Sequence, residues 1–476
     1  MTDKKIPYFF ALLPISLLIV LLAYNVFLYG DNSLSGANQL ALLLAGSLAA
    51  IIGVKYGSTW EDIISGITKS ISSTTPALII LLLIGSLAGT WLLSGIVPAM
   101  IYYGLQILSP KIFLLATCVI CAIVSIATGS SWSTIATIGI ALIGIGQALG
   151  FSIGITAGAI ISGAYFGDKM SPLSDTTNLA PAMAGTDLFT HIRYMMYTTI
   201  PSFVITLILF IVIGLNYEAD TLYDVNDLLI AIENTFTING WLFLVPCLVV
   251  VLIVKKVAPI PALLAGTLAG GLFAVIFQPN IILSVSGEDI FSTKASYLAI
   301  INAMGNEIAI FTENQMINNL LSTGGMYGML NTIWLIICAM IFGGTMEATQ
   351  LLRRISEPIL QLANSTGSLV ATTAGTCMFF NTTASDQYLS IVVPGRMFTN
   401  TYKEKGLAPE NLSRTLEDAG TVTSVLIPWN TCGATQSAVL GVATFAYLPY
   451  CFFNIISPFM TIAYAYLGVK IKHLKQ

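Results

Sequence analysis

Uncharged apolar runs that are long enough to cross a lipid bilayer constrain this chain more than any other feature. The first, "YFFALLPISLLIVLLAYNVFLYG" (Tyr8–Gly30), carries no charge and exceeds the ~20 residues that a spanning helix needs. Only 9% of the 476 residues are charged and 56% are hydrophobic, whereas a soluble domain has about 25% charged residues. The sequence therefore predicts an all-α polytopic membrane protein.

The basic residues predict how the chain is threaded through the membrane, because Lys and Arg collect in cytoplasmic loops. If Lys4 and Lys5 lie inside, about ten crossings put all but three of the 19 basic residues on that side. Segment 217–239 holds five acids and no Lys or Arg, so we expect an external acidic linker there. The chain is thus predicted to lie in the cytoplasmic membrane as a multi-pass protein with both termini in the cytoplasm.

Two parts of the chain, 1–216 and 240–476, carry the same features at an offset of 256 residues, with Pro172 matching Pro428. The first part has a predicted hairpin at about 112–147 and a broken helix at about 150–187. The second has them at about 366–395 and 415–442. We expect both hairpins to be re-entrant, with two half-length arms each. Five crossings per part would insert the second part upside down, giving the inverted repeats typical of secondary transporters.

The stretch "GDKMSPLSDTTN" (Gly167–Asn178) places Asp168, Lys169 and Asp175 inside the predicted membrane region. Each charge at the centre of a bilayer costs about 2.5–3.5 kcal/mol, so these side chains must pair, titrate or face a cavity. Pro172 cannot donate a backbone hydrogen bond and disfavours helix at the residue before it. We therefore expect the helix to open near 168–178.

Oxygen ligands surround this predicted break and suit a hard cation such as Na⁺. Asp168 is the expected proton carrier, Lys169 a charge partner, and Asp175 with Ser174 and Thr177 the expected Na⁺ ligands. The full set of candidate proton- and cation-binding residues is Asp168, Ser174, Asp175, Thr176, Thr177, Asn178 and Asp386. Facing candidates in the second repeat are Asn381 and Thr382 at the hairpin and Asn430 and Thr431 at the Pro428 break.

Purely structural interpretations of these charges remain open. Lys169 could pair with Asp168 or Asp175 only to hold the fold, and Asp386 could cap its own hairpin tip. Glu417 and Asp418 are expected to begin the second broken helix, where acids interact favourably with the helix dipole.

The segment "SGAYFGDKMSPLSDTTNLAPAMAGTDLFTHIR" resembles the signature region of the NhaC family of Na⁺/H⁺ antiporters, and the whole chain is similar to that family in length and hydropathy. The resemblance implies a scaffold domain and a transport domain, two re-entrant hairpins, two broken helices, a homodimer and elevator-like motion. Some members of the wider superfamily exchange malate and lactate coupled to Na⁺ and H⁺, so small carboxylates are further candidate substrates.

The favoured function is the exchange of Na⁺ for H⁺ by alternating access, with no cofactor and no nucleic-acid partner. A Na⁺/H⁺-coupled malate/lactate antiporter on the same fold is the main alternative. An intramembrane aspartyl protease using Asp168 and Asp386 lacks the usual GxGD motif. A channel fits poorly with a charged site that occurs twice, and the absence of a GxxxxGK[ST] motif argues against a nucleotide-driven pump.

Overall fold

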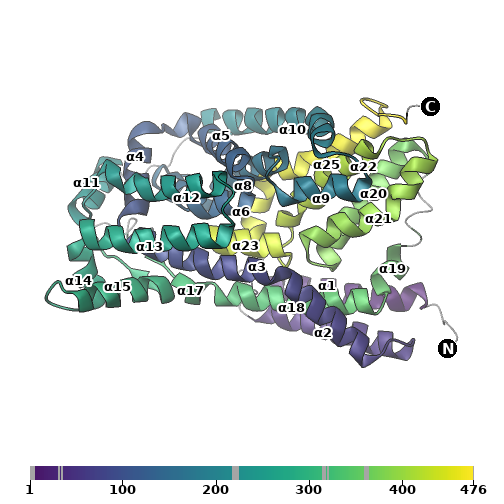
Figure 1. Ribbon diagram of the computed structural model, residues 1–476, viewed down its shortest axis with the longest axis horizontal. Coiled ribbons are helices and arrows are strands. Elements are labelled where there is room, and N and C mark those ends of the chain that lie inside the picture. Colours follow the sequence, from purple (N-terminus) through teal and green to yellow (C-terminus); the bar gives the residue numbers. More distant parts are fainter. Residues whose placement is uncertain are drawn as a thin grey trace.

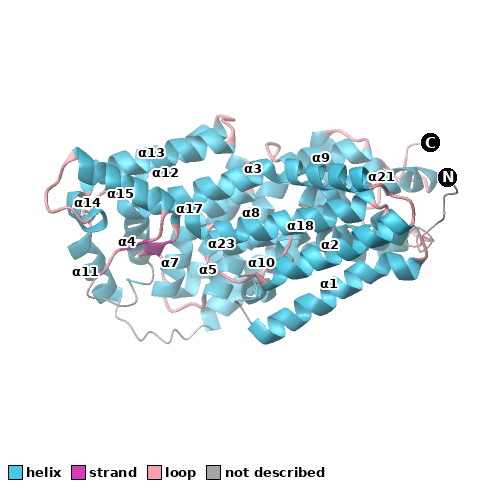
Figure 2. Ribbon diagram, turned by 90° about the horizontal axis from the view of Figure 1, so that it is seen from below, coloured by secondary structure: helices cyan, strands magenta, loops and turns pink. Residues whose placement is uncertain are grey.

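The computed structural model is a bundle of helices, most of which run side by side along the long axis of the molecule (Figure 1). It describes residues 6–29, 33, 36–216, 225–312, 318, 321–356, 358 and 364–474. Within these residues the only sheet is one short antiparallel pair, which lies towards one end of the bundle (Figure 2). The all-α fold class is confirmed.

The helices of the first half are α1 (Tyr8–Tyr29), α2 (Ala37–Lys55), α3 (Trp60–Leu93), α4 (Ile96–Ile107), α5 (Pro110–Thr128), α6 (Ser131–Thr134), the π-helical turn η2 (Ile135–Gly139), α7 (Ile140–Ala148), α8 (Ile153–Met170), α9 (Asp175–Ala184) and α10 (Leu188–Asn216). The second half contains α11 (Val225–Thr235), η3 (Gly240–Phe243), α12 (Leu244–Val254), α13 (Pro259–Phe277), α14 (Pro279–Ser286), α15 (Thr293–Gly305), β1 (Ile308–Ala309), β2 (Ser322–Thr323), α17 (Gly325–Gly328), α18 (Leu330–Ala348), α19 (Leu351–Ser356), α20 (Thr366–Thr383), α21 (Gln387–Glu404), α22 (Pro409–Thr415), the π-helical turn η5 (Leu416–Thr421), η6 (Ser424–Leu426), α23 (Thr431–Leu440), α24 (Thr444–Tyr447), η7 (Leu448–Tyr450) and α25 (Phe452–Tyr466).

Eight of the described helices are long and apolar enough to cross a membrane, and the number is ten if each of two bent pairs forms one span. One pair, α11 with α12, is bent by 87°, and the other, at α24–α25, by 56°. The predicted number of about ten crossings lies within this range. The segment expected as an acidic linker contains α11, whereas Lys4, Lys5 and residues 217–224 lie outside the described residues.

Helix α10 buries polar side chains and exposes apolar ones, the reverse of a surface helix in a soluble protein. Its Thr198, Ser202 and Thr206 are buried, and each hydroxyl donates to a backbone carbonyl of its own helix. Its Val204 and Ile208 are exposed. Because hydrocarbon is as apolar as these side chains, the inward polar stripe and the outward apolar face fit a helix surrounded by lipid.

Helices α5 and α8 approach closely because α8 carries Gly163 and Gly167 four residues apart. A Cβ on Gly163 would lie 2.0 Å from the carbonyl oxygen of Cys118, and one on Gly167 would lie 2.4 Å from that of Ala122. Small residues at this spacing let two membrane helices pack backbone to backbone. This contact fixes α8, the helix that carries the predicted cation-binding motif, against the first hairpin.

Helix α3 is one continuous helix of 34 residues that runs through Pro76; membrane helices tolerate such an internal proline. One expectation about helix lengths is wrong. The hairpin arms are not half-length: α5 has 19 residues, segment 131–148 has 18, and α20 and α21 have 18 each. The polar tips interrupt the helices for only a few residues, so each arm keeps nearly the length of a span.

Helix ends recur at a constant separation of 256 residues. Gly129 and Ser385 both have positive φ at the hairpin tips, and Gly185 and Gly441 both end the helices that follow the breaks. Gly150 and Gly406 also share a positive φ. The two parts of the chain therefore repeat the same series of backbone turns, although their sequences differ.

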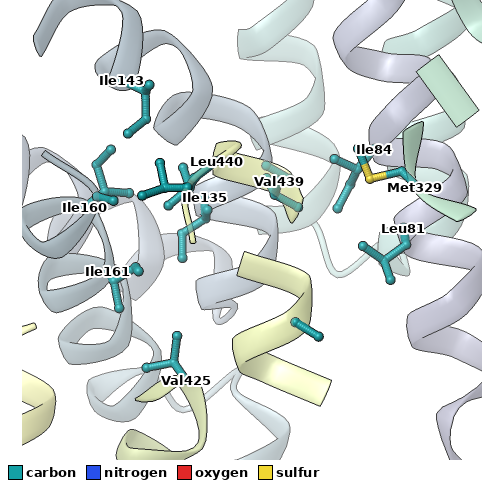
Figure 3. Close-up of a cluster of buried hydrophobic side chains, with 14 of the residues drawn as sticks. Leu81, Ile84, Ile135, Ile143, Ile160, Ile161, Met329, Val425, Val439 and Leu440 are labelled. Carbon is teal, nitrogen blue, oxygen red and sulfur yellow. The ribbon is translucent and has the colours of Figure 1, made fainter. Parts of the chain in front are cut away.

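An apolar cluster joins α3 to the first hairpin and to α23. Leu440 lies beside Ile135 and Ile160, whereas Ile84 of α3 lies near Met329 (Figure 3). Leu440 and the two isoleucines of the hairpin side are buried, as is Ile84. These contacts pack α23 against both α8 and the first hairpin.

Candidate functional site

The first helix break spans residues 171–174, between α8 and α9. Pro172 lacks an amide hydrogen, and the chain extends at Ser171 and Ser174 before α9 begins. The Ser174 hydroxyl accepts from the amide of Thr177, and the Asn178 amide donates to the carbonyls of Pro172 and Ser174 at 3.0 and 2.6 Å. Side chains of the motif itself thus satisfy the backbone groups that the break frees.

Asp168 lies on the last turn of α8 and is 6% exposed. Its Oδ2 accepts a hydrogen bond from the hydroxyl of Ser131, the first residue of α6, at 2.7 Å. Its Oδ1 is buried and has no hydrogen-bond partner in the described part of the chain. One oxygen of this carboxyl is therefore available for a proton or a cation.

Asp175 is the first residue of α9 and is exposed. The hydroxyl of Tyr388, from the first turn of α21, donates to its Oδ2. A side chain from the second half of the chain therefore orients a carboxylate from the first half.

A cavity of about 420 Å³ brings the three predicted carboxylates Asp168, Asp175 and Asp386 together. The remaining residues around it are Ser73, Thr74, Pro76, Ala77 and Ile80 of α3, Ser130, Trp132 and Ser133 at the first hairpin tip, Ala258, Pro259 and Ile260 at the start of α13, Gln387 and Tyr388 of α21, and Thr431 of α23. Both hairpin tips and both broken helices contribute to it. No Lys, Arg or His is among these lining residues.

Asp386 has a structural role as well as a place in this cavity. It precedes α21, and its Oδ1 accepts from the amide of Leu389 at 2.9 Å. It is only 3% exposed. The self-capping interpretation is thus realised, and the same side chain still faces the other two carboxylates across the cavity.

The candidate residues of the second repeat do not all lie at the cavity: Asn381 and Asn430 form a buried pair, and Thr431 lies in the cavity wall. Asn381 and Asn430 hydrogen-bond to each other at 3.2 Å, and Asn381 also donates to the carbonyl of Gly420 at 2.7 Å. Thr382 bonds within its own helix, to Met378. Only Thr431 lines the cavity, so the two asparagines join the second hairpin to the second break and do not face the carboxylates.

The first-repeat hydroxyls predicted as Na⁺ ligands lie behind Asp175 rather than in the cavity wall. Ser174 and Thr177 are buried, and the Thr177 hydroxyl donates to the carbonyls of Asp168 and Lys169 at 3.3 and 3.1 Å. The Thr176 hydroxyl lies 3.1 Å from that of Ser174. Asn178 is exposed and bonds only to the break described above.

Lys169 pairs with neither aspartate of its own motif. Its ammonium forms a fully buried ion pair with Asp418 and donates to Ser457 at 3.2 Å, and Asp418 also accepts from Thr198 at 2.8 Å. The alternative that it pairs with Asp168 or Asp175 is not realised; Asp168 is its neighbour on α8, and adjacent positions on a helix point about 100° apart. Lys169 therefore faces η5, away from the cavity that Asp168 lines.

The expectation that Glu417 and Asp418 begin a helix is also wrong. They lie in the π-helical turn η5, inside a helical segment that begins at Pro409. Both are buried with 0% exposure. Their neighbours come from helices far apart in the sequence, and no local pattern could reveal that.

Sequence reasoning missed Trp132, Ser133, Gln387 and Tyr388, which line the cavity, and Ser131, which donates to Asp168. A signal existed, because all of them follow directly on the hairpin tips that the repeat had marked. Among the described residues no group of three or more His, Cys, Asp or Glu side chains is arranged to hold a resident metal ion. Any ion held in the cavity would use carboxylate, hydroxyl and backbone oxygens from both halves.

The fold and the cavity define an integral membrane protein with an acidic site to which two broken helices and two hairpins contribute. Residues 163–469 match the Na⁺/H⁺ antiporter family. The chain is 38% identical to the Na⁺/H⁺ antiporter NhaC of Alkalihalophilus pseudofirmus, over 98% of this chain and 97% of that one. It is 37% identical to the malate-2H⁺/Na⁺-lactate antiporter of Bacillus subtilis, over 100% and 98% of the two chains.

The chain therefore belongs to the Na⁺/H⁺ antiporter family, as the resemblance of its motif implied. Among solved structures, the Neisseria gonorrhoeae antimetabolite efflux pump MtrF covers 95% of both chains at 13% identity and a TM-score of 0.42.

Proposed function

We propose that this protein exchanges Na⁺ for H⁺ across the cytoplasmic membrane by alternating access. The observation that carries the proposal is the single cavity into which both halves of the chain direct carboxylates, without a basic residue in its wall. Three acids around one cavity repel one another and attract cations. Membership of the Na⁺/H⁺ antiporter family supports the same function.

In this proposal Na⁺ and protons compete for the same carboxyl groups. Asp168 takes the proton, since its Oδ1 is buried without a partner. Asp175 binds Na⁺, and Tyr388 holds it towards the cavity. The Ser174 and Thr177 hydroxyls support the break from behind, and Thr431 adds an oxygen from the second half. A proton leaves as Na⁺ arrives because two positive charges at one site repel.

Two elements of the cavity wall follow closely on basic residues in the sequence. The wall includes Thr74 and Pro259, which follow Lys69 on α3 and Lys255–Lys256 before α13. Positive charge marks the cytoplasmic side, so we assign this structure to a state that is open to the cytoplasm. With that orientation, the chain's termini are proposed to be cytoplasmic.

A second cavity of about 490 Å³ supports alternating access. On α3, Ala77 and Ile80 line the carboxylate cavity. One turn further along, Ile84 and Ala88 line the second cavity, together with Glu307. Several residues of the apolar cluster of Figure 3, among them Ile84, Val439 and Leu440, line this second cavity. Movement of the hairpins and broken helices past these side chains would transfer the site from one side to the other.

We also propose that the two repeated parts are inverted with respect to the membrane. The shared turns at Gly150 and Gly406 support a repeat, and Lys405 places the second turn on the basic side. An odd number of crossings between them would put the first turn outside. The homodimer implied by the family resemblance is retained as a prediction that cross-linking in native membranes would test.

The malate/lactate alternative is less well supported by the geometry. A dicarboxylate needs positive groups, and the cavity wall has none. Lys169, the one positive charge of the motif, is neutralised by Asp418.

Transport into vesicles tests the proposal. Purified protein is reconstituted with a trapped pH dye, the interior is acidified, and NaCl is added outside. We expect Na⁺ alone to dissipate the pH gradient in wild type and in the control Asp187→Asn. The Asp187 carboxylate of wild type is exposed and accepts a hydrogen bond from the amide of Thr190. Asp168→Asn should abolish the exchange. A gradient that collapses only with Na⁺ plus malate or lactate would establish the carboxylate exchanger instead.

A further inference from the structure

Glu417 is a buried carboxyl that the cation cavity does not use. It lies in η5 with 0% exposure, and neither of its oxygens has a hydrogen-bond partner in the described part of the chain. The nearby Thr421 hydroxyl is itself buried without a partner. An unpaired buried carboxylate strongly raises the free energy of a folded membrane protein. The presence of Glu417 at this position therefore needs an explanation.

The charges around Glu417 do not balance. Lys169 and Asp168 of α8 and Asp418 of η5 are the charged groups that interact with it electrostatically. The single positive charge of Lys169 is already held by Asp418, with Ser457 and Thr198 completing the cluster. Lys169 is thus not free to pair with Glu417, and a lone carboxylate in such an apolar interior must acquire a proton or a cation.

The backbone links this cluster to the cavity. Asp168 and Lys169 are adjacent on the last turn of α8 and point in different directions, one to the cavity and one to Asp418. The Thr177 hydroxyl donates to the carbonyls of both residues, so the first break holds the two sites together. The acids themselves lie on a π-helical turn, a distortion that is frequent at functional sites. The first break and the last turn of α8 thus connect the cavity physically to the cluster around Glu417.

We propose that Glu417, beside the Lys169–Asp418 pair, is a second proton-binding residue of the transport cycle, separate from the three carboxylates of the cavity. This inference rests on the proposed Na⁺/H⁺ exchange and deepens it. The proton leaves Glu417 when Na⁺ occupies the cavity and returns when Na⁺ is released. No bond other than the O–H bond of the carboxyl is made or broken.

The test is a count of the protons released per Na⁺ bound by purified protein, measured with a pH dye in weakly buffered detergent solution. We expect wild type to release more than one proton per Na⁺, and Glu417→Gln to release one fewer. Glu410→Gln is the matched control, because Glu410 is a buried glutamate of the adjoining helix α22 that pairs with Lys472 outside the cluster. Its count should equal that of wild type.

An equal count in wild type and Glu417→Gln would overturn the inference while leaving the exchange intact. Wild type that binds Na⁺ without releasing protons would instead contradict the proposed function. If Glu417→Gln does not fold, infrared difference spectra of Glu417→Asp and wild type decide the matter. A carboxylic-acid C=O band that disappears on adding Na⁺ and shifts in Glu417→Asp supports the inference, whereas a spectrum identical in the two proteins overturns it.

Discussion

The Tyr388 hydroxyl, from the second half of the chain, donates a hydrogen bond to Asp175 in the first half and orients this carboxylate. Both residues are exposed. A hydrogen bond to a charged group contributes about 1.5–3 kcal/mol. Removing it frees the carboxylate and helps protons to compete for it. We expect Tyr388→Phe to raise the Na⁺ concentration for half-maximal exchange by about tenfold, with little change in maximal rate.

Rates of Na⁺-driven proton movement at several Na⁺ concentrations measure this effect. Tyr297→Phe is a suitable control, because Tyr297 is 64% exposed on the surface of α15. An unchanged Na⁺ dependence in Tyr388→Phe would show that Asp175, in the orientation that Tyr388 gives it, is not a ligand of the Na⁺ site.

The Lys169–Asp418 ion pair leads to a prediction about stability. Removing one partner of a buried pair leaves an uncompensated charge and costs about 3–5 kcal/mol, whereas replacing both partners by neutral groups costs much less. Lys169→Met should therefore lower the melting temperature of the purified protein strongly, and Lys169→Met with Asp418→Asn should recover much of the loss. Fluorescence melting in detergent measures both, with the exposed Lys255→Met as control.

A double variant that melts no higher than Lys169→Met would contradict the account of this pair. Any recovery should be specific to position 418, so Asp187→Asn, which removes an exposed carboxylate, should not restore stability to Lys169→Met.

The sequence predicted the residues of the site better than their pairings. Asp168, Asp175, Asp386 and Thr431 do meet around one cavity. Hydropathy and proline positions reveal where a membrane helix opens, because both effects are local. The partner of Lys169 lies 249 residues away, and only the packing of α8 against η5 determines that contact.

At the scale of elements, the backbone contact between α5 and α8 positions the cation-binding motif. A side chain at Gly163 has no room, since its Cβ would lie 2.0 Å from the carbonyl oxygen of Cys118. We expect Gly163→Leu to separate the helices, lower the melting temperature and abolish exchange. Gly375→Leu on α20, where a Cβ would meet no atom within 4 Å, is the control.

Size-exclusion chromatography and melting of the two glycine variants check this prediction. A folded, active Gly163→Leu protein would show that α8 is positioned by other contacts, for example by its packing against α25.

At the scale of the whole molecule, the repeat predicts opposite exposure of equivalent turns. Ser152 follows the turn at Gly150, and Lys405 precedes the turn at Gly406; both side chains are exposed. If the repeats are inverted, Ser152→Cys should react with a membrane-impermeant maleimide in intact cells, and Lys405→Cys only after the cells are permeabilised. The background needs Cys247→Ser, since Cys247 is the exposed cysteine among the seven.

Labelling of both positions from the same side would contradict inversion. Part of this architecture was readable from the sequence, because the offset of 256 residues recurs in the helix ends. The length of the hairpin arms was not readable from the sequence. A short polar tip such as Gly129–Ser130 indicates an interruption, but it does not reveal how far the helices on either side extend.

The central claim is that Na⁺ and protons compete for the same carboxylates. Titration calorimetry of Na⁺ binding to purified wild-type protein over a range of pH tests it most directly. Competition with one proton predicts that Na⁺ affinity increases about tenfold per pH unit on the acidic side, and more steeply if a second proton is displaced. Asp175→Asn should show no measurable Na⁺ binding. Na⁺ affinity that is independent of pH in wild type would contradict the account.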